Sequence, residues 1–317
     1  MEFIRHLKQL RPQHRGCVAT IGNFDGVHLG HQAVLQQVAQ RAAALNLPTM
    51  VILFEPQPAE FFTPKTAPSR LTRLREKLIA LQSYSVDRVL CVQFNADFAA
   101  LTADEFIQQV LVEGLGVRHL VIGDDFQFGK GRAGNFNTLQ QAGIKFGFAV
   151  ERQTTFSIDG VRVSSTRVRQ ALVAGDLPLA NQLLGREYSI CGRVGYGQQR
   201  GRTIDFPTAN LKLHRLIPPL KGVFAVTMHG IEAQAITGVA NLGTRPTVNG
   251  QDFLLEVHLF DFNQVIYGRY VSINFLKKIR DEQRFADFNA LKQQIECDGQ
   301  QARAFFANKP DTVPKKI

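Results

Sequence analysis

Residues 20–32 read TIGNFDGVHLGHQ and place three glycines, one Asp and two His between an apolar run and a helical pattern. His28 and His31 are three residues apart, so both imidazoles could face one phosphate group. The glycines let a ligand approach the backbone, and the N-terminus of the following helix favours an anion. A glycine turn with a capping His is the simpler structural alternative. The string lacks the spacing of a dinucleotide-binding or P-loop motif, so we expect a phosphate site of another kind.

A second polar motif, VSSTRVRQAL, covers residues 163–172. Its three hydroxyl residues could hydrogen-bond a phosphate at the start of a helix, and its arginines add forked cations. The hydroxyl residues are Ser164, Ser165 and Thr166, and the arginines are Arg167 and Arg169. The structural alternative is an ordinary basic helix with a serine cap.

Two apolar segments, FEPQPAEFF (54–62) and IGDDFQFG (122–129), follow expected strands. Their flat side chains could hold an aromatic ring system, and Asp125 could bind its polar edge. The flat side chains are Pro56, Pro58, Phe62, Phe126 and Phe128. Without further information, these residues could equally form core beneath a loop.

The second half contains a Gly-rich stretch, GRVGYGQQRGRTIDFPTANL, at 192–211. Arg200 and Arg202 could fold with it over phosphates, or could be solvated arginines of a hairpin. Further on, LLEVHLFDF (254–262) alternates as a strand does, with Glu256 and His258 on one face and apolar residues on the other.

The elements that position these residues follow two patterns. The first half alternates buried strands with helices and predicts a parallel sheet in a doubly wound α/β domain. The strands are 17–21, 49–54, 87–94 and 118–123, and the helices are 31–45, 71–82 and 102–115, the last capped by Thr102 with Glu105. After residue 186 the pattern changes to strands separated by turns, which predicts an antiparallel barrel or sandwich closed by a helix at 284–306.

Length and composition agree with two domains, which we place at 1–186 and 187–317. A net charge of +10 favours anionic partners, either nucleic acid or phosphate-bearing small molecules. The four cysteines stand far apart without a C-x-x-C pair, which suits reduced thiols in the cytoplasm. No apolar run approaches the roughly 20 residues that cross a bilayer, so we expect a soluble protein without a membrane partner.

Taken in order, five motifs resemble those of the bacterial bifunctional riboflavin kinase/FAD synthetases. In chain order they are G-x-F-D-G-x-H-x-G-H, the pair of apolar segments (54–62 and 122–129) taken as one motif, VSSTRVRQAL, the PTAN segment (207–210) and LLEVHLFDF. The resemblance implies an N-terminal nucleotidylyltransferase (Rossmann-like) domain and a C-terminal β-barrel riboflavin kinase domain with a terminal helix. It also implies that riboflavin is phosphorylated by ATP to FMN, which a second ATP then adenylylates to FAD and pyrophosphate.

The resemblance also implies roles for individual residues. The catalytic residues would be His28, His31, Arg169 and Glu256, with Glu256 as general base. The nucleotide-binding residues would be Gly22, Phe24, Asp25, Gly30, Ser164, Ser165, Thr166, Arg202, Thr208 and Asn210. The flavin-binding residues would be Pro56, Pro58, Phe62, Asp125, Phe128 and Arg162. Thr208 and Asn210 would hold Mg²⁺, a hard ion that suits oxygen ligands.

Two departures from the family pattern leave alternatives open. Asp205 stands where the kinase motif usually carries Gly, and Asp124 doubles the acid beside Asp125. One alternative is therefore a chain with only one active half. A separate alternative, which the basic pI and the similarity of H-x-G-H to a tRNA synthetase motif support, is a flavin-sensing or nucleic-acid-binding protein. The absence of a long basic helix or RNA-binding aromatic motif disfavours it. We expect riboflavin, FMN, FAD and ATP as ligands and no nucleic acid. The sequence does not decide whether the chain forms a homo-oligomer.

Overall fold

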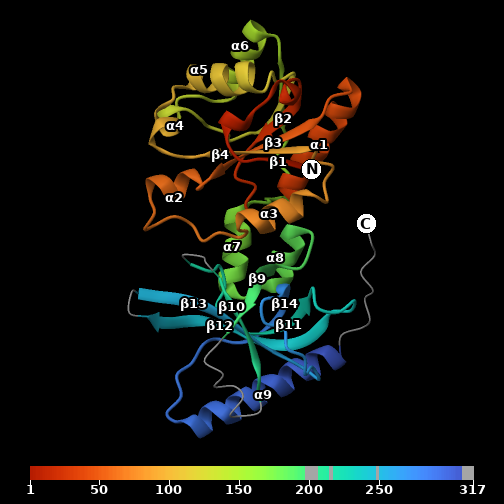
Figure 1. Ribbon diagram of the computed structural model, residues 1–317, viewed down its shortest axis with the longest axis vertical. Coiled ribbons are helices and arrows are strands. Elements are labelled where there is room, and N and C mark those ends of the chain that lie inside the picture. Colours follow the sequence, from red (N-terminus) through yellow and green to blue (C-terminus); the bar gives the residue numbers. More distant parts are fainter. Residues whose placement is uncertain (197–205, 214–216, 248–249, 309–317) are drawn as a thin grey trace. The chain divides into compact units, whose positions relative to one another are not determined.

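The computed structural model describes residues 1–196, 206–213, 217–247 and 250–308 (Figure 1). The chain divides into two compact units. The first contains Met1–Pro68 and Thr72–Ser165, and the second contains Ser69–Leu71 and Thr166–Ile317. This division passes through the start of one helix, and the domain boundary near residue 186 remains a prediction.

The first unit is built on a parallel sheet with the strand order β1-β4-β3-β2-β5-β6. The strands are β1 (Glu2–Ile4), β2 (Val18–Ile21), β3 (Thr49–Glu55), β4 (Arg88–Gln93), β5 (His119–Gly123) and β6 (Ala149–Gln153). From β2 the chain proceeds to β3 and β4 in one direction and to β5 and β6 in the other. Ligands of such sheets bind beyond the carboxyl ends of the strands at this reversal.

Helices cover both faces of the sheet (Figure 1). They are α1 (Leu29–Leu45), α2 (Pro58–Phe62), α3 (Leu74–Leu81), α4 (Ala96–Ala100), α5 (Ala103–Phe106), η3 (Ile107–Gly114) and α6 (Phe136–Phe146). Neighbouring residues of β2 point to opposite faces. Val18 packs into a core with α1 and α3, while Ala19 packs into a core with α5, η3 and α6. The doubly wound α/β fold predicted from the alternating pattern is confirmed.

Short elements complete this unit. They are η1 (Leu7–Gln9), η2 (Pro12–His14), η4 (Lys130–Arg132), and the hairpin of β7 (Ser157–Ile158) and β8 (Val161–Arg162). The predicted cap at Thr102 is also present. The Thr102 N–H donates to Glu105 Oε2 at 2.8 Å, and the Glu105 N–H donates to Thr102 Oγ1 at 3.2 Å. This reciprocal pair satisfies two of the unpaired donors at the start of α5.

The second unit contains a closed antiparallel barrel with the order β10-β13-β12-β11-β14-β9. The strands are β9 (Ser189–Gly195), β10 (Thr208–Lys212), β11 (Gly222–His229), β12 (Ile236–Thr247), β13 (Gly250–Leu259) and β14 (Tyr270–Arg280). The helices are α7 (Ser165–Ala174), α8 (Leu177–Leu184) and α9 (Phe288–Ala307). The structure therefore selects the barrel over the sandwich and confirms the terminal helix.

The helix α9 packs against β11, β12 and β14 (Figure 1). Ala302 of this helix shares a core with Val223, Val239 and Phe260 of the barrel. No helix in the described part of the chain is long and apolar enough to cross a membrane. None of the four cysteines forms a disulfide bond.

Candidate active sites

The turn after β2 brings the two predicted histidines into contact. Phe24, Gly26 and Val27 adopt positive φ angles of 46°, 85° and 43°, which bend the chain into α1. His28 caps this helix, because its Nδ1 accepts the His31 N–H at 3.3 Å. The two rings stack with their centroids 3.7 Å apart. Since Nδ1 of His28 accepts, a neutral His28 ring carries its proton on Nε2, which becomes a donor.

Gly30 lies where this turn meets the second predicted motif. A Cβ atom at Gly30 would lie 3.2 Å from the His28 ring and 3.2 Å from the carbonyl oxygen of Val163. Two residues further, Ser165 Oγ donates to the Asp25 carbonyl oxygen at 2.9 Å. The structure therefore packs residues 163–165 against the turn, and the absence of a side chain at Gly30 permits the close approach.

Asp25 holds the turn from within. Its side chain is buried, and Oδ1 accepts the Thr72 N–H at 2.9 Å and the Thr72 hydroxyl at 3.1 Å. The Gly26 N–H donates to Thr72 Oγ1 at 2.9 Å. Asp25 thus fixes the backbone that carries His28, and a direct contact between Asp25 and the nucleotide remains a prediction.

The remaining predicted nucleotide residues of this half occupy different surroundings. Gly22 is tight against the Phe24 ring, since a Cβ atom would lie 3.2 Å from it. Thr166 and Arg169 belong to the second compact unit. Arg169 Nε donates to the Ser69 carbonyl oxygen at 2.6 Å, so this guanidinium anchors the segment Ser69–Leu71. The contacts of Ser164, Thr166 and Arg169 with a nucleotide also remain predictions.

The two predicted flavin segments are joined by a continuous series of phenylalanine rings. The ring centroids of Phe62 and Phe94 are 5.7 Å apart, and those of Phe94 and Phe98 are also 5.7 Å apart. The ring centroids of Phe98 and Phe106 are 6.0 Å apart. Phe106 in turn lies 5.3 Å from Phe128. Most of these contacts are edge-to-face, the geometry that aromatic pairs prefer. Phe62 at one end is 62% exposed, whereas Phe128 at the other is buried.

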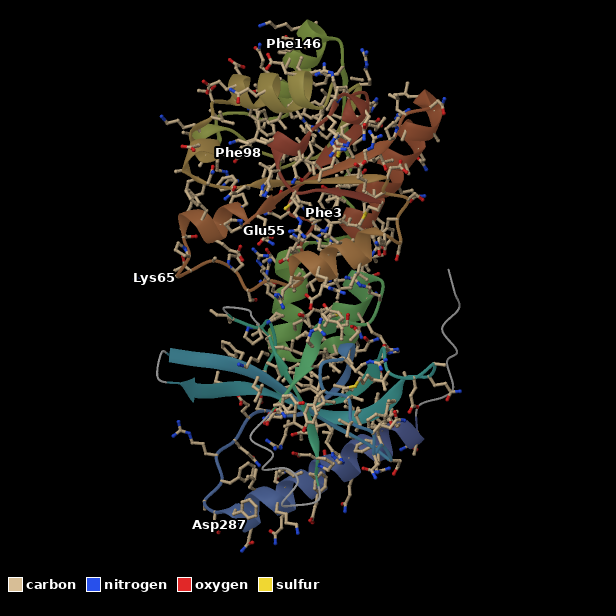
Figure 2. All side chains as sticks on the ribbon, viewed as in Figure 1. Phe3, Glu55, Lys65, Phe98, Phe146 and Asp287 are labelled. Atoms are coloured by element: carbon tan, nitrogen blue, oxygen red, sulfur yellow. The ribbon has the colours of Figure 1, made fainter. Side chains whose placement is uncertain are left out.

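Phe94, Phe98 and Phe106 were not among the residues selected from the sequence. Figure 2 labels Glu55 at the end of β3 and Phe98 on α4, the helix that follows β4. Because β3 and β4 are parallel neighbours, the segments after them meet at one edge of the sheet. The usable signal was the aromatic pair Phe94 and Phe98 in FNADF, which begins at the last residue of the predicted strand 87–94.

Other predicted flavin residues lie at the rim of this edge. Asp125 Oδ2 accepts Arg162 Nη2 at 2.9 Å, with side chains 70% and 50% exposed. Such an exposed pair contributes little stability and can be rearranged at low cost. Pro56 is exposed and Pro58 is half-buried. Asp124, the additional acid, accepts the Thr155 hydroxyl at 2.7 Å.

The barrel unit contains a cavity of about 460 Å³ between its wall and α9. Residues of five strands, of α9 and of the chain before it line this cavity. They include Thr208, Asn210, Val223, Asn241, Leu254, Glu256, His258, Arg280, Glu282, Phe285, Leu291 and Asp298. Leu255, Val257 and Leu259 are buried on the opposite face of β13. The predicted alternation of this strand is therefore confirmed.

The strand register aligns the polar residues of the cavity in rows. Asn210 of β10 pairs with Glu256 of β13, which pairs on its other side with Asn241 of β12. Thr208 pairs with His258 in the next row. Directly opposite side chains in a sheet are roughly 5 Å apart, so Glu256 lies between two amides. The sequence did not indicate a site role for Asn241, because it does not show that this residue pairs with Glu256.

Thr208 and Asn210 have the chemistry that a hard cation requires. Asn210 is 8% exposed, and its Nδ2 donates to the Thr208 carbonyl oxygen at 3.2 Å. Its amide oxygen is therefore the atom that could coordinate a metal. Among the described residues, no group of three or more His, Cys, Asp or Glu side chains could hold a metal ion. Arg202 and Asp205 lie outside the residues that the structure describes.

Two further groups shape the cavity. Arg280 binds Asp298 of α9 through Nε at 2.8 Å and Nη2 at 2.7 Å, and Asp298 is buried. This paired contact joins the helix to the end of β14. His258 Nδ1 lies 3.0 Å from the Pro207 carbonyl oxygen. Burial lowers the pKa of His258, which favours its neutral form.

The first unit is a parallel sheet with a His-x-Gly-His turn, which is typical of nucleotidylyltransferases. The second unit is a barrel in which the PTAN segment leads into β10. Together these features define the class as an enzyme with two sites that act on phosphate groups. The FAD synthetase family matches residues 10–167, and the riboflavin kinase family matches residues 184–306. The chain belongs to the family of bifunctional riboflavin kinase/FMN adenylyltransferases.

Curated relatives support this assignment over nearly the whole chain. The Haemophilus influenzae protein named bifunctional riboflavin kinase/FMN adenylyltransferase is 53% identical over 96% of this chain and 99% of its own. The Pseudomonas fluorescens protein of the same name is 52% identical over 97% of this chain and 98% of its own. A crystal structure described as a macrolide-efflux protein from Streptococcus pneumoniae is 31% identical, covers 95% of this chain and 98% of its own, and has a TM-score of 0.80.

Proposed function

We propose that this chain makes FAD from riboflavin in two steps at two separate sites. The barrel unit transfers the γ-phosphoryl group of ATP to the riboflavin 5′-hydroxyl and yields FMN and ADP. The sheet unit then joins the FMN phosphate to the α-phosphorus of a second ATP and yields FAD and pyrophosphate. Each unit carries its own arrangement of polar and aromatic residues, which is the observation that carries this proposal.

In the sheet unit, His28 and His31 stabilise charge on the nucleotide. The Nε2–H of His28 is the proton that its ring can donate, because its Nδ1 is already bound by the His31 N–H. The ring stack fixes both imidazoles, and α1 directs its N-terminal partial positive charge to the same point. As the FMN phosphate attacks, negative charge grows on the departing pyrophosphate, and these preorganised donors neutralise it.

The flavin of FMN would pack on the exposed end of the aromatic series in the same unit. Phe62 offers an exposed ring there, and Pro56 and Pro58 add flat apolar surface. Asp125 and Arg162 are positioned to bind polar atoms at the rim once their exposed ion pair opens.

In the barrel unit, Thr208 and Asn210 would hold Mg²⁺ through the Thr208 hydroxyl and the Asn210 amide oxygen. The fit rests on the donor atoms, since Asn210 uses its amide nitrogen to bind the Thr208 carbonyl. The bound ion would neutralise charge on the ATP phosphates. Glu256 lies beside Asn210 in the register and accepts the proton that the riboflavin hydroxyl loses on attacking the γ-phosphorus.

The proposal also includes the domain boundary near residue 186 and a cytoplasmic location. Four cysteines without a disulfide bond suit a reducing compartment.

The direct test supplies the chain with riboflavin and MgATP and separates the flavins by chromatography. The proposal expects FMN first and FAD later. FMN without FAD, together with no turnover of supplied FMN, would leave only the kinase. Turnover of supplied FMN without use of riboflavin would leave only the adenylyltransferase. RNA binding that weakens steeply with salt, without flavin turnover, would favour the nucleic-acid alternative.

A further inference from the structure

His258 lies on the strand that pairs with the proposed metal ligands. It pairs with Thr208 across β10 and β13, and its ring lies 4.7 Å from that of Phe206. Its Nδ1 is 3.0 Å from the Pro207 carbonyl oxygen. The side chain therefore contacts the two residues that lead into β10.

The hydrogen bond has a defined direction. A carbonyl oxygen only accepts, so Nδ1 of His258 must carry the proton. This holds for the Nδ1–H tautomer of the neutral ring and for the imidazolium, both of which donate from Nδ1. The contact therefore does not depend on the charge of His258.

Pro207 makes this hydrogen bond important for the strand start. Proline lacks an N–H group, and β10 begins one residue later, at Thr208. The His258 side chain therefore binds the backbone at the residue directly before the strand. The next carbonyl, that of Thr208, accepts Asn210 Nδ2 at 3.2 Å. Two side chains together fix the backbone from which Thr208 projects.

His258 is itself held firmly. Its ring lies 5.9 Å from that of Phe260, which is covered by the guanidinium of Arg303 at 4.3 Å. Arg303 also forms a bidentate pair with Asp261 at 2.8 and 3.0 Å, although both of these side chains are exposed. A Cβ atom at Gly238 would clash with the His258 carbonyl oxygen, so the backbones of β12 and β13 are also in close contact there.

We propose that His258 is a positioning residue of the kinase site, which holds the Phe206–Pro207 segment through Nδ1 and thereby sets the Thr208 hydroxyl for MgATP. This inference rests on the proposed function, because it acts through Thr208 as a ligand.

The test measures FMN formation by the full chain, with KM for MgATP and kcat determined separately. His258→Phe keeps a ring but removes the donor, and it should raise KM about fivefold, the effect of one neutral hydrogen bond, with a smaller change in kcat. His258→Asn places an amide donor near the position of Nδ1 and should restore KM to within about twofold of the unaltered chain. His229→Phe is the matched control, because His229 is an exposed histidine of the same barrel. It should leave both constants unchanged.

Thr208→Val separates this inference from the proposed function. If Thr208→Val raises KM and His258→Phe does not, the positioning role is wrong and the proposed ligand stands. If Thr208→Val has no effect, the proposed ligand and the positioning role both fail. Equal impairment of His258→Asn and His258→Phe would overturn the hydrogen-bond role.

A second measurement does not depend on any variant being active. Nitrogen NMR of the imidazoles, with His258 assigned by the signal that His258→Asn removes, reports which ring nitrogen carries the proton. The inference expects a proton on Nδ1. A neutral ring protonated only on Nε2 would overturn it.

Discussion

Gly30→Ala would press directly on the histidine pair of the sheet unit. The added Cβ atom would lie 3.2 Å from Cε1 of His28. Unbonded carbon atoms relax at about 3.5–4.0 Å. The ring would therefore have to move by roughly 0.3–0.8 Å, or the Val163 carbonyl on the other side would have to retreat.

Two effects of this substitution oppose each other. Alanine in place of glycine at an unstrained position stabilises a protein by about 0.4–1 kcal/mol, because the unfolded chain loses conformational entropy, and Gly30 is the second residue of α1. The steric contact offsets this gain and displaces a charge-stabilising group. Because a displacement of about 1 Å can cost a hundredfold in rate, we expect FAD formation from FMN to fall about tenfold without a gain in stability.

The assay follows FAD formation from FMN and FMN formation from riboflavin in one preparation, together with urea unfolding. FMN formation should persist. Gly299→Ala in α9 is the matched control, because its Cβ atom would make an ordinary contact of 3.7 Å with Phe206. It should leave FAD formation from FMN unchanged. A Gly30→Ala enzyme that makes FAD at the normal rate and is more stable by about 1 kcal/mol would refute the packing argument.

Three further predictions concern other parts of the molecule. Phe94→Ala removes the ring between Phe62 and Phe98 and should raise KM for FMN by about tenfold or more, since burying a large aromatic side chain contributes about 1.5–3 kcal/mol. An unchanged KM for FMN would contradict the aromatic site. Asn210→Ala should weaken MgADP binding to the full chain, measured by calorimetry, while FAD formation from supplied FMN continues. The hydrogen bond from Arg41 holds the pKa of Glu151 at about 2, below about 4.3 in an unfolded chain. The ionised carboxylate thus adds stability above pH 4.3 that is lost as the pH falls through about 2, so the unfolding free energies of the unaltered chain and Glu151→Gln should converge over that range.

The fold was largely predictable because its signals are local. Alternating strands and helices in the first half gave a doubly wound sheet, and the Thr102–Glu105 cap marked the helix α5 correctly. β1 (Glu2–Ile4) was not predicted. It is only three residues long and forms by pairing with β4, more than 80 residues away in the chain, so its own composition carried little information.

The sites were only partly predictable because they depend on distant partners. The sequence selected Phe62 and Phe128, but the rings that link them come from segments after β4, whose position beside β3 follows from the strand order. From the sequence, Asp25 could be recognised only as a charged residue, without its hydrogen-bond partners. Its hydrogen bonds to Thr72, 47 residues away, became visible in the fold. The same applies to Asn241, which meets Glu256 through the barrel register.

The central claim is that two independent sites act in sequence, and crossing one variant from each site tests it most directly. His31→Ala and Glu256→Gln are each given riboflavin with MgATP, and in parallel FMN with MgATP, and the flavins are separated by chromatography. His31→Ala should accumulate FMN and form FAD about a hundredfold more slowly. Glu256→Gln should form FMN about a hundredfold more slowly and convert supplied FMN to FAD at the normal rate. Loss of both activities in both variants would contradict the account.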